Sequence, residues 1–206
     1  MKVLMATTNE GKVAIFKEEF DKLNIEILTL KDLNITTSPE ENGKSVVENA
    51  IIKAKYYYAL TKMPVFANDA GLVINKFSKE EQAGLFVRRF GGVELTDKQM
   101  IERYIEKLNK VGGKSKAHFN VGLAIITDSG ALYSKSFKPK LLFINKPSGI
   151  IKKGVPLDSL VYDHKTKKYK SEMTIQERNK TEGNAFKKQA QFIKRVFLNK
   201  KIRSIK

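Results

Sequence analysis

The sequence predicts an α/β fold in which a mixed β-sheet is flanked by helices. In the first hundred residues, short apolar runs that are typical of strands alternate with segments of helical periodicity. Further along the chain, apolar runs joined by short turns indicate hairpins. With 206 residues and 41% apolar content, the chain is long enough for one globular domain. We therefore expect residues 1–206 to form a single domain.

The first elements follow from apolar spacing. The stretch KVLMATT, residues 2–8, predicts a strand that leads through the polar loop NEGK into a helix over about 13–23. IEILTL, residues 25–30, predicts a second strand. From residue 45 to about residue 60, apolar residues recur at helical spacing, which places Asn49, Lys53 and Tyr57 together on another face of that helix.

The later elements are marked by turn residues. PVFAN, residues 64–68, and GLVIN, residues 71–75, predict two strands joined by a turn at Asp69–Gly71. Thr96 is placed to cap an amphipathic helix that extends to Leu108. AHFNVGLAIIT, DSG and ALYSKSF predict a long hairpin, and LLFI predicts a further strand. A final helix is expected from about Thr174 to Leu198, followed by the basic tail NKKIRSIK.

The charge balance limits the function. Thirty-nine Lys and Arg residues against 22 Asp and Glu residues give a net charge of +17, which attracts nucleotides, nucleic acid or anionic lipid. The absence of cysteine excludes disulfides and thiol nucleophiles and fits a reducing cytosol. No segment reaches the roughly 18 apolar residues of a membrane span. We expect a soluble, cytoplasmic protein with no membrane partner.

Polar clusters stand at the ends of predicted elements, where functional sites are usually built. In TTNEGK, the residues Thr7, Thr8, Asn9 and Lys12 lead from a strand into a helix start, a position that favours phosphate. An ordinary helix-capping turn explains the same residues. Asp69 follows an apolar strand, and a turn-capping aspartate explains it equally well.

Two further clusters contain carboxylates. Glu41 precedes the helix that carries Asn49 and Lys53, and Asp158 lies in a loop, GVPLDSL, after a basic stretch. Each carboxylate alone is explained by capping or by solvation. In combination, Glu41 and Asp69 supply the oxygen ligands that Mg²⁺ prefers. Basic residues would then hold the phosphate oxygens of a substrate, namely Lys12, Lys53 and Arg89.

The order of these clusters resembles the inosine triphosphate pyrophosphatase family, which hydrolyses non-canonical purine nucleoside triphosphates such as ITP, dITP and XTP to the monophosphate and pyrophosphate. The family's T-x-N-x-x-K is similar to TTNEGK, its E-T-G-x-[ST]-F-x-E-N-A-x-x-K-A to ENGKSVVENAIIKA, and its E-D-[ST]-G-L to NDAGL. AGLFVRRFGG, GVPLDS and SEMTIQER resemble three later family motifs. The resemblance covers nearly the whole chain in the right order.

The resemblance implies an elongated mixed sheet in two lobes with a central cleft, a Mg²⁺ cofactor and a homodimer. Asp69 and Lys53 would be catalytic, and Glu41 and Asp69 would bind the metal. The substrate would be bound by the residues that match the family's polar positions: Thr7, Thr8, Asn9, Lys12, Asn49, Arg89, Asp158 and Arg178.

Several positions depart from the family pattern. Asn68 stands where the family has a glutamate before its catalytic aspartate, and residues 182–184 read EGN in place of S-H-R. Leu157 replaces an aromatic residue. These changes favour triphosphate hydrolysis over any particular base. They leave open a relative that acts on another nucleotide, and a catalytically silent protein that binds nucleotide or RNA. A purely structural interaction protein would leave the ordered polar clusters unexplained.

Overall fold

The chain folds into two compact units in a computed structural model that describes residues 1–20, 25–90, 92–181 and 185–198. The first unit comprises the described residues of 1–70, 121–137 and 185–198. The second comprises those of 71–120 and 138–181. Two long strands, β3 (Val65–Ile74) and β6 (Lys114–Ile126), contribute residues to both units.

The sheet of the first unit is parallel at one side and antiparallel at the other. Its strand order is β2-β1-β3-β6-β7, with β1 at Lys2–Met5, β2 at Glu26–Thr29 and β7 at Leu132–Phe137. β1 is parallel to β2 and β3, with Leu4 opposite Val65, whereas β6 and β7 form the predicted antiparallel hairpin. This arrangement confirms the predicted mixed sheet.

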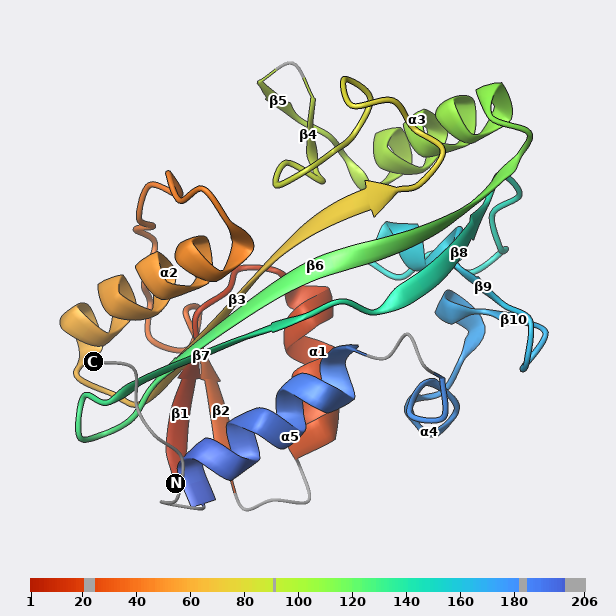
Figure 1. The fold of residues 1–206 in the computed structure, drawn as a ribbon. Helices are drawn as coiled ribbons and strands as arrows, with labels where there is room; N and C mark the ends of the chain where they lie inside the picture. The colour runs from red at the N-terminus through yellow and green to blue at the C-terminus, as the bar shows by residue number, and fades with distance from the viewer. Residues whose placement is uncertain (21–24, 91, 182–184, 199–206) are drawn as a thin grey trace. The chain divides into compact units, whose positions relative to one another are not determined.

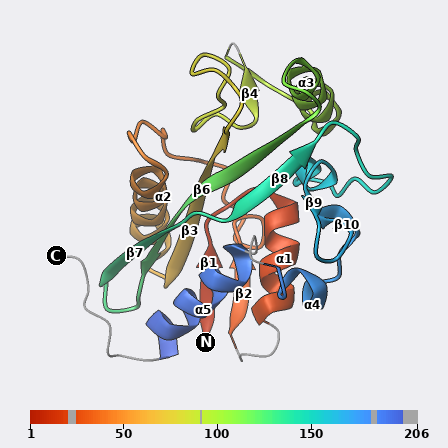
Figure 2. The same ribbon diagram turned by 45° about the vertical axis from the view of Figure 1, so that its right-hand side comes forward.

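Helices cover both faces of this sheet. α1 (Glu10–Phe20) and α5 (Ala185–Leu198) lie on one face, and α2 (Val46–Thr61) lies on the other (Figures 1 and 2). Phe16 and Phe20 of α1 pack on Phe66 of β3, with ring centroids 5.3 and 6.1 Å away. On the other face, buried alanines let α2 approach the sheet closely: Ala50, Ala54, Ala67 and Ala124.

Gly122 shows how closely α2 approaches the sheet. A Cβ atom at this position of β6 would lie 2.2 Å from the carbonyl oxygen of Val46, the first residue of α2. Side chains do not tolerate such a distance, so only glycine fits without movement of the helix. Gly122 therefore sets the height at which α2, with its polar residues, lies over the sheet.

The second unit packs a helix against the other ends of β3 and β6. α3 (Asp97–Lys110) begins at Thr96 with a complete capping box, as its sequence predicts. Its apolar face, including Met100, Tyr104 and Leu108, packs with Phe143 of β8 (Lys140–Ile144) and with Leu160. Short elements complete the unit: β4 (Arg89–Phe90), β5 (Val93–Glu94), η1 (Pro156–Ser159), β9 (Tyr162–Asp163), β10 (Lys168–Tyr169), η2 (Lys170–Glu172) and α4 (Ile175–Arg178).

The predicted turn at Asp69–Gly71 is wrong, because β3 runs through these residues without interruption. Gly71 instead permits a close backbone approach. Leu72 N donates a hydrogen bond to Gly84 O over 2.9 Å, and a Cβ on Gly71 would lie 2.5 Å from that same oxygen. The glycine thus marks a crossing of two chain segments in the second unit.

The single final helix predicted from Thr174 to Leu198 is also wrong. α4 ends at Arg178, and α5 begins at Ala185. Thr174 does cap α4, through a capping box with Glu177. The end of the first predicted helix at residues 21–24, the tripeptide at 182–184 and the basic tail at 199–206 lie outside the described residues.

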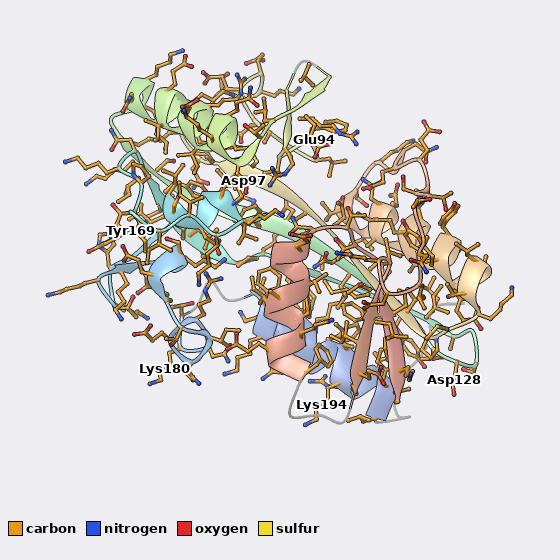
Figure 3. All side chains as sticks on the ribbon, turned by 180° about the vertical axis from the view of Figure 1, so that it is seen from behind. Glu94, Asp97, Asp128, Tyr169, Lys180 and Lys194 are labelled. Atoms are coloured by element: carbon orange, nitrogen blue, oxygen red, sulfur yellow. The ribbon has the colours of Figure 1, made fainter. Side chains whose placement is uncertain are left out.

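Charged side chains cover the surface of both units. Lys194 of α5 and Lys180, two residues after α4, are exposed examples (Figure 3). Among the described residues, no helix combines the length and the apolar content that crossing a membrane requires.

Candidate active site

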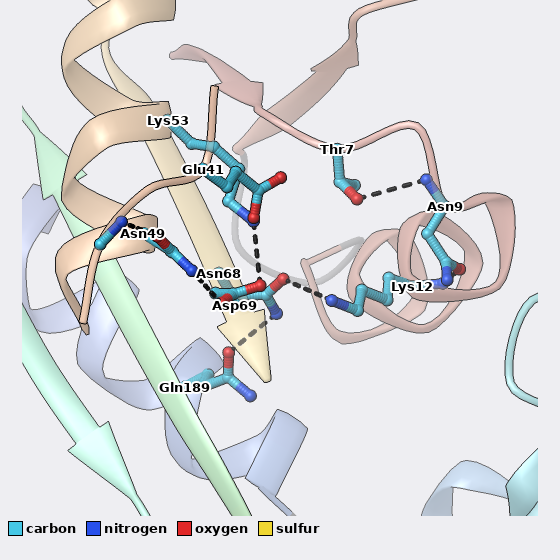
Figure 4. A network of polar contacts seen from close by, with 10 residues as sticks. Thr7, Asn9, Lys12, Glu41, Asn49, Lys53, Asn68, Asp69 and Gln189 are labelled. Carbon is cyan, nitrogen blue, oxygen red and sulfur yellow. Dashed lines mark hydrogen bonds and ion pairs between the residues drawn. The ribbon is translucent and has the colours of Figure 1, made fainter. Parts of the chain in front are cut away.

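Two neighbouring residues of β3 place polar groups on opposite faces of the first unit's sheet. β1 ends at Met5, and its last partner on β3 is Phe66, so Asn68 and Asp69 lie just beyond the carboxyl end of β1. Ligands of parallel α/β sheets usually bind at this edge. Because side chains alternate along a strand, Asp69 meets α2 while Asn68 meets α1 and α5 (Figure 4).

Asp69 is joined to Glu41 through one ammonium group. Lys53 Nζ donates to Asp69 Oδ1 over 3.1 Å and to Glu41 Oε2 over 3.0 Å (Figure 4). The side chains of Lys53 and Asp69 are each only 14% exposed, whereas that of Glu41 is 42% exposed. Limited solvent access strengthens the attraction between the two less exposed charges. The structure thus brings together three of the predicted site residues.

Asn49 holds Asp69 from the other side. Its Nδ2 donates to Asp69 Oδ2 over 3.2 Å, and its Oδ1 accepts from Gly43 N over 2.8 Å. Both ends of this buried amide are thereby used within the protein. A Cβ on Gly43 would lie 2.6 Å from Asn49 Oδ1, so the contact requires glycine. These bonds fit a positioning role for Asn49.

The loop that carries Glu41 is fastened to α2. Ser45 caps the helix by accepting from Glu48 N, and Glu48 Oε2 accepts from Lys44 N over 2.8 Å. Tyr57 OH donates to Thr37 O over 3.1 Å. Burial raises the pKa of Tyr57 above its usual value, so the phenol stays protonated and remains a donor.

The start of α1 forms the polar loop predicted from TTNEGK. Asn9 Oδ1 accepts from Lys12 N over 2.9 Å and so caps α1, while Thr7 Oγ1 accepts from Asn9 N over 3.2 Å. Thr8 is exposed. The side chain of Lys12 turns to β3, where Nζ donates to Asn68 Oδ1 over 3.2 Å. The loop is therefore both a helix cap and a neighbour of the Asp69 strand.

Gln189 is a member of the site that sequence reasoning missed. It lies on α5, is 1% exposed, and its Oε1 accepts from Asn68 Nδ2 over 3.1 Å. In the sequence, Gln189 lies at helical spacing from the buried apolar residues Ala185 and Ile193, so its position indicates only a residue that packs in the core. Only the fold brings it to Asn68.

The predicted residues of the second unit divide into two groups. Asp158 and Arg178 form a buried pair, with Arg178 Nη1 donating to Asp158 Oδ2 over 2.9 Å. Lys170, which the sequence did not single out, approaches Asp158 Oδ1 at 3.3 Å. Arg178 Nη2 is buried and finds no hydrogen-bond partner in the part of the chain that the structure describes. Arg89 lies exposed on β4.

A separate pocket of about 740 Å³ lies wholly within the second unit. His118 and His164 line it together with Lys170 and Tyr162, and His164 also packs edge-on against the ring of Tyr162. None of the first unit's polar residues described above lines it. Its lining contains a single carboxylate, Asp163.

The donor set around Asp69 fits a small divalent cation. Glu41 Oε2 and Asp69 Oδ1 contact the same nitrogen, so both oxygens already face one cationic group. Carboxylate oxygens are the ligands that Mg²⁺ prefers, and one or two suffice when substrate phosphates and water complete the shell. Among the described residues, no group of three or more His, Cys, Asp or Glu side chains is placed to hold a metal ion.

The relatives to which this chain is similar include two proteins named dITP/XTP pyrophosphatase. The dITP/XTP pyrophosphatase of Wigglesworthia glossinidia brevipalpis is 32% identical over 210 residues, which cover 94% of this chain and 97% of that protein. The dITP/XTP pyrophosphatase of Leptospira interrogans is 37% identical, but its alignment covers only 61% of this chain and 62% of its own length. Curated relatives are therefore matched over very different shares of their length.

Solved structures agree with the fold. A HAM1 protein from Coxiella burnetii is similar with a TM-score of 0.70 and 25% identity, covering 95% of this chain and 98% of that one. The Ham1 protein of Staphylococcus aureus gives a TM-score of 0.69 at 22% identity, covering 94% and 98%. The sequence profile of the Ham1 family matches residues 3–192. The chain belongs to the Ham1 family.

Proposed function

We propose that this protein hydrolyses a non-canonical purine nucleoside triphosphate, such as ITP, dITP or XTP, to the monophosphate and pyrophosphate. The observation that carries the proposal is the Asp69 carboxylate, which Lys53 and Asn49 hold at the sheet edge beyond β1. The names of the Wigglesworthia and Leptospira relatives supply the substrate class.

In the proposed reaction, water attacks the α-phosphorus and Asp69 takes the proton that the water loses. A bond forms between the water oxygen and the α-phosphorus, and the bond from that phosphorus to the bridging oxygen breaks, so that pyrophosphate leaves. Lys53 has two tasks. It orients the Asp69 carboxylate through their contact of 3.1 Å, and it supplies positive charge where negative charge collects on the phosphate oxygens.

The start of α1 would bind the phosphates. Thr7 and Thr8 offer hydroxyl groups, Asn9 holds the first turn in shape, and Lys12 adds a full positive charge beside the helix N-terminus. Because these contacts exist before the reaction as well as during it, they should act mainly on the Michaelis constant. Asn49 and Arg89 were predicted to contact substrate as well, and the contacts of Asn49 favour positioning.

Magnesium is the cofactor that we propose, with Glu41 and Asp69 as its protein ligands. When bound, Mg²⁺ would neutralise charge on the transferring phosphoryl group. Glu41 is the more exposed of the two carboxylates, so it is accessible to an incoming metal–nucleotide complex. Lys53 contacts both ligand oxygens and would have to share them with the ion.

Recognition of the base is assigned to Asp158 and Arg178. Their mutual bond leaves Arg178 Nη2 without a described partner, and a buried donor of this kind suits an acceptor such as a purine carbonyl.

We also expect a homodimer in the cytoplasm. Sedimentation of the purified protein and fractionation of the source cells test these two expectations.

The test of the function is pyrophosphate release from a panel of triphosphates with Mg²⁺. The panel contains ITP, dITP, XTP and the four standard nucleotides. We expect turnover of at least one of the first three, and a loss of about 100-fold or more in kcat for Asp69→Asn. Asp128→Asn, an exposed aspartate on the β6–β7 turn, is the matched control (Figure 3). Equal rates in Asp69→Asn and wild type would contradict the assignment of Asp69.

A second candidate is a catalytically silent protein that binds nucleotide or RNA. The motivating features are Asn68, an amide where the family that the sequence resembles has a carboxylate, and the sequence EGN at residues 182–184. The net charge of +17 is consistent with this candidate. RNA binding through that charge would weaken steeply as salt rises. Turnover of a triphosphate, combined with the absence of salt-dependent RNA binding, would exclude this candidate.

A further inference from the structure

We infer that Gln189 is a positioning residue, which acts through Asn68 to hold Lys12 in place for phosphate; the inference rests on the proposed function. Three hydrogen bonds carry it. Gln189 Nε2 donates to Ala185 O over 3.2 Å, Gln189 Oε1 accepts from Asn68 Nδ2 over 3.1 Å, and Asn68 Oδ1 accepts from Lys12 Nζ over 3.2 Å. We call these four groups the amide relay. Figure 4 shows the part of the relay from Gln189 through Asn68 to Lys12.

The direction of the amide relay is fixed by its two ends. A backbone carbonyl such as Ala185 O only accepts, and an ammonium such as Lys12 Nζ only donates. Each amide between them must therefore present its nitrogen toward Ala185 and its oxygen toward Lys12. Reversal of either amide would place two donors or two acceptors face to face, at a cost that is large for buried groups.

Burial makes the amide relay rigid. Gln189 is 1% exposed and Asn68 is 5% exposed, so water does not readily replace either partner. Asn68 is also fixed by its strand, since Phe66 packs with Phe16 on the same face of β3. The Lys12 ammonium therefore meets an acceptor whose position is set by α5, although Lys12 itself belongs to α1.

The neutral character of the relay distinguishes Lys12 from Lys53. Two carboxylates attract the Lys53 ammonium as an ion pair. On the other face of β3, the Lys12 ammonium meets the amide oxygen of Asn68. An amide orients an ammonium group with much less electrostatic attraction than a carboxylate exerts. Sharing the Lys12 ammonium with a phosphate oxygen would consequently cost little attraction at the Asn68 contact.

The experiment is a double-mutant cycle on pyrophosphate binding, measured by calorimetry with Mg²⁺. We expect Gln189→Met to weaken pyrophosphate binding about fivefold to tenfold in the wild-type background and less than about twofold in the Lys12→Met background. The effect should shrink because Gln189 acts on pyrophosphate through the Lys12 ammonium, which Lys12→Met removes. Gln191→Met, on the exposed side of α5, is the matched control and should change nothing. Equal weakening in both backgrounds would show that Gln189 only supports the fold.

A second readout needs no ligand. The Nδ2 protons of Asn68 should exchange with solvent about tenfold or more slower in wild type than in Gln189→Met, as followed by NMR. Equal exchange in the two proteins would overturn the amide relay. If Gln189→Met does not fold, Asn68→Leu breaks the relay from the other side and should give the same pattern in the binding cycle.

The outcomes separate the relay from the proposed function. Turnover of a triphosphate without the expected non-additivity would overturn the relay and keep the hydrolase. Non-additive pyrophosphate binding without turnover of any triphosphate would keep the relay and overturn the hydrolase. A wild-type protein that binds no pyrophosphate would overturn the relay's role in phosphate binding.

Discussion

Asn49 Nδ2 lies 3.2 Å from Asp69 Oδ2 and, through Asn49 Oδ1, ties that carboxylate to the backbone of Gly43. The pair connects the start of α2 with the middle of β3. The carboxylate is therefore oriented by a neutral donor on one oxygen and by the Lys53 ammonium on the other.

Replacing Asn49 by Leu should lower both stability and activity. The backbone N–H of Gly43 loses its acceptor and Asp69 loses a donor, which should cost about 2–4 kcal/mol of unfolding free energy. We expect kcat to fall about tenfold or more, since Asp69 is no longer held. Urea unfolding and steady-state kinetics measure the two effects. Asn42→Leu, in the exposed loop nearby, is the control, and equal losses in both variants would contradict a specific role.

Lys53 and Glu41 should shift the magnesium requirement in opposite directions. Lys53→Met frees the two oxygens that Lys53 contacts, so the half-saturating Mg²⁺ concentration should fall severalfold while kcat also falls. Glu41→Gln removes a charged ligand and should raise that concentration. Lys55→Met, on the exposed side of α2, serves as control. Shifts in the same direction for both variants would contradict a shared cation site.

Gly122 should not tolerate a methyl group. Gly122→Ala places a Cβ 2.2 Å from Val46 O, and the displacement of α2 should cost about 1–3 kcal/mol or more. Gly149→Ala is the matched control, because a Cβ there would meet nothing within 4 Å. Thermal and urea unfolding of both variants provide the comparison. A Gly122→Ala protein as stable as Gly149→Ala would show that α2 moves without cost.

The buried pair Asp158–Arg178 should be sensitive to the loss of one partner. Asp158→Leu leaves a buried guanidinium without its carboxylate and should cost about 3–5 kcal/mol. The double variant Asp158→Leu/Arg178→Met should recover part of that loss. By contrast, Glu106→Gln breaks the exposed pair with Lys110 and should change the unfolding free energy by less than about 1 kcal/mol. Additive losses in the double variant would contradict coupling.

The sequence predicted those parts of the fold that depend on local pattern. The capped helix at Thr96, the hairpin of β6 and β7, and the helix bearing Asn49 and Lys53 follow from apolar spacing and capping residues. The turn at Asp69 was wrong because Gly71 serves a close contact with Gly84, which is distant in sequence and leaves no local signal.

The site was predictable to a similar extent. Glu41, Lys53 and Asp69 were proposed from their residue types and their order, and the structure brings their side chains into contact. Gln189 was missed because its position on α5 has the spacing of a core residue. The substrate role of each residue stays a prediction, since contacts within the protein do not reveal what binds to it.

The alternation of Asn68 and Asp69 on β3 has a consequence for insertions and deletions. Removing one residue earlier in this strand would bring the Asp69 carboxylate to the position beside Gln189, and adding one residue would bring the Asn68 amide to the position beside Lys53. A point substitution changes the contacts of one side chain, whereas an insertion or deletion of one residue would break the contacts of both Asn68 and Asp69. The spacing from Val65 to Asp69 is thus constrained by the contacts on both faces of the sheet.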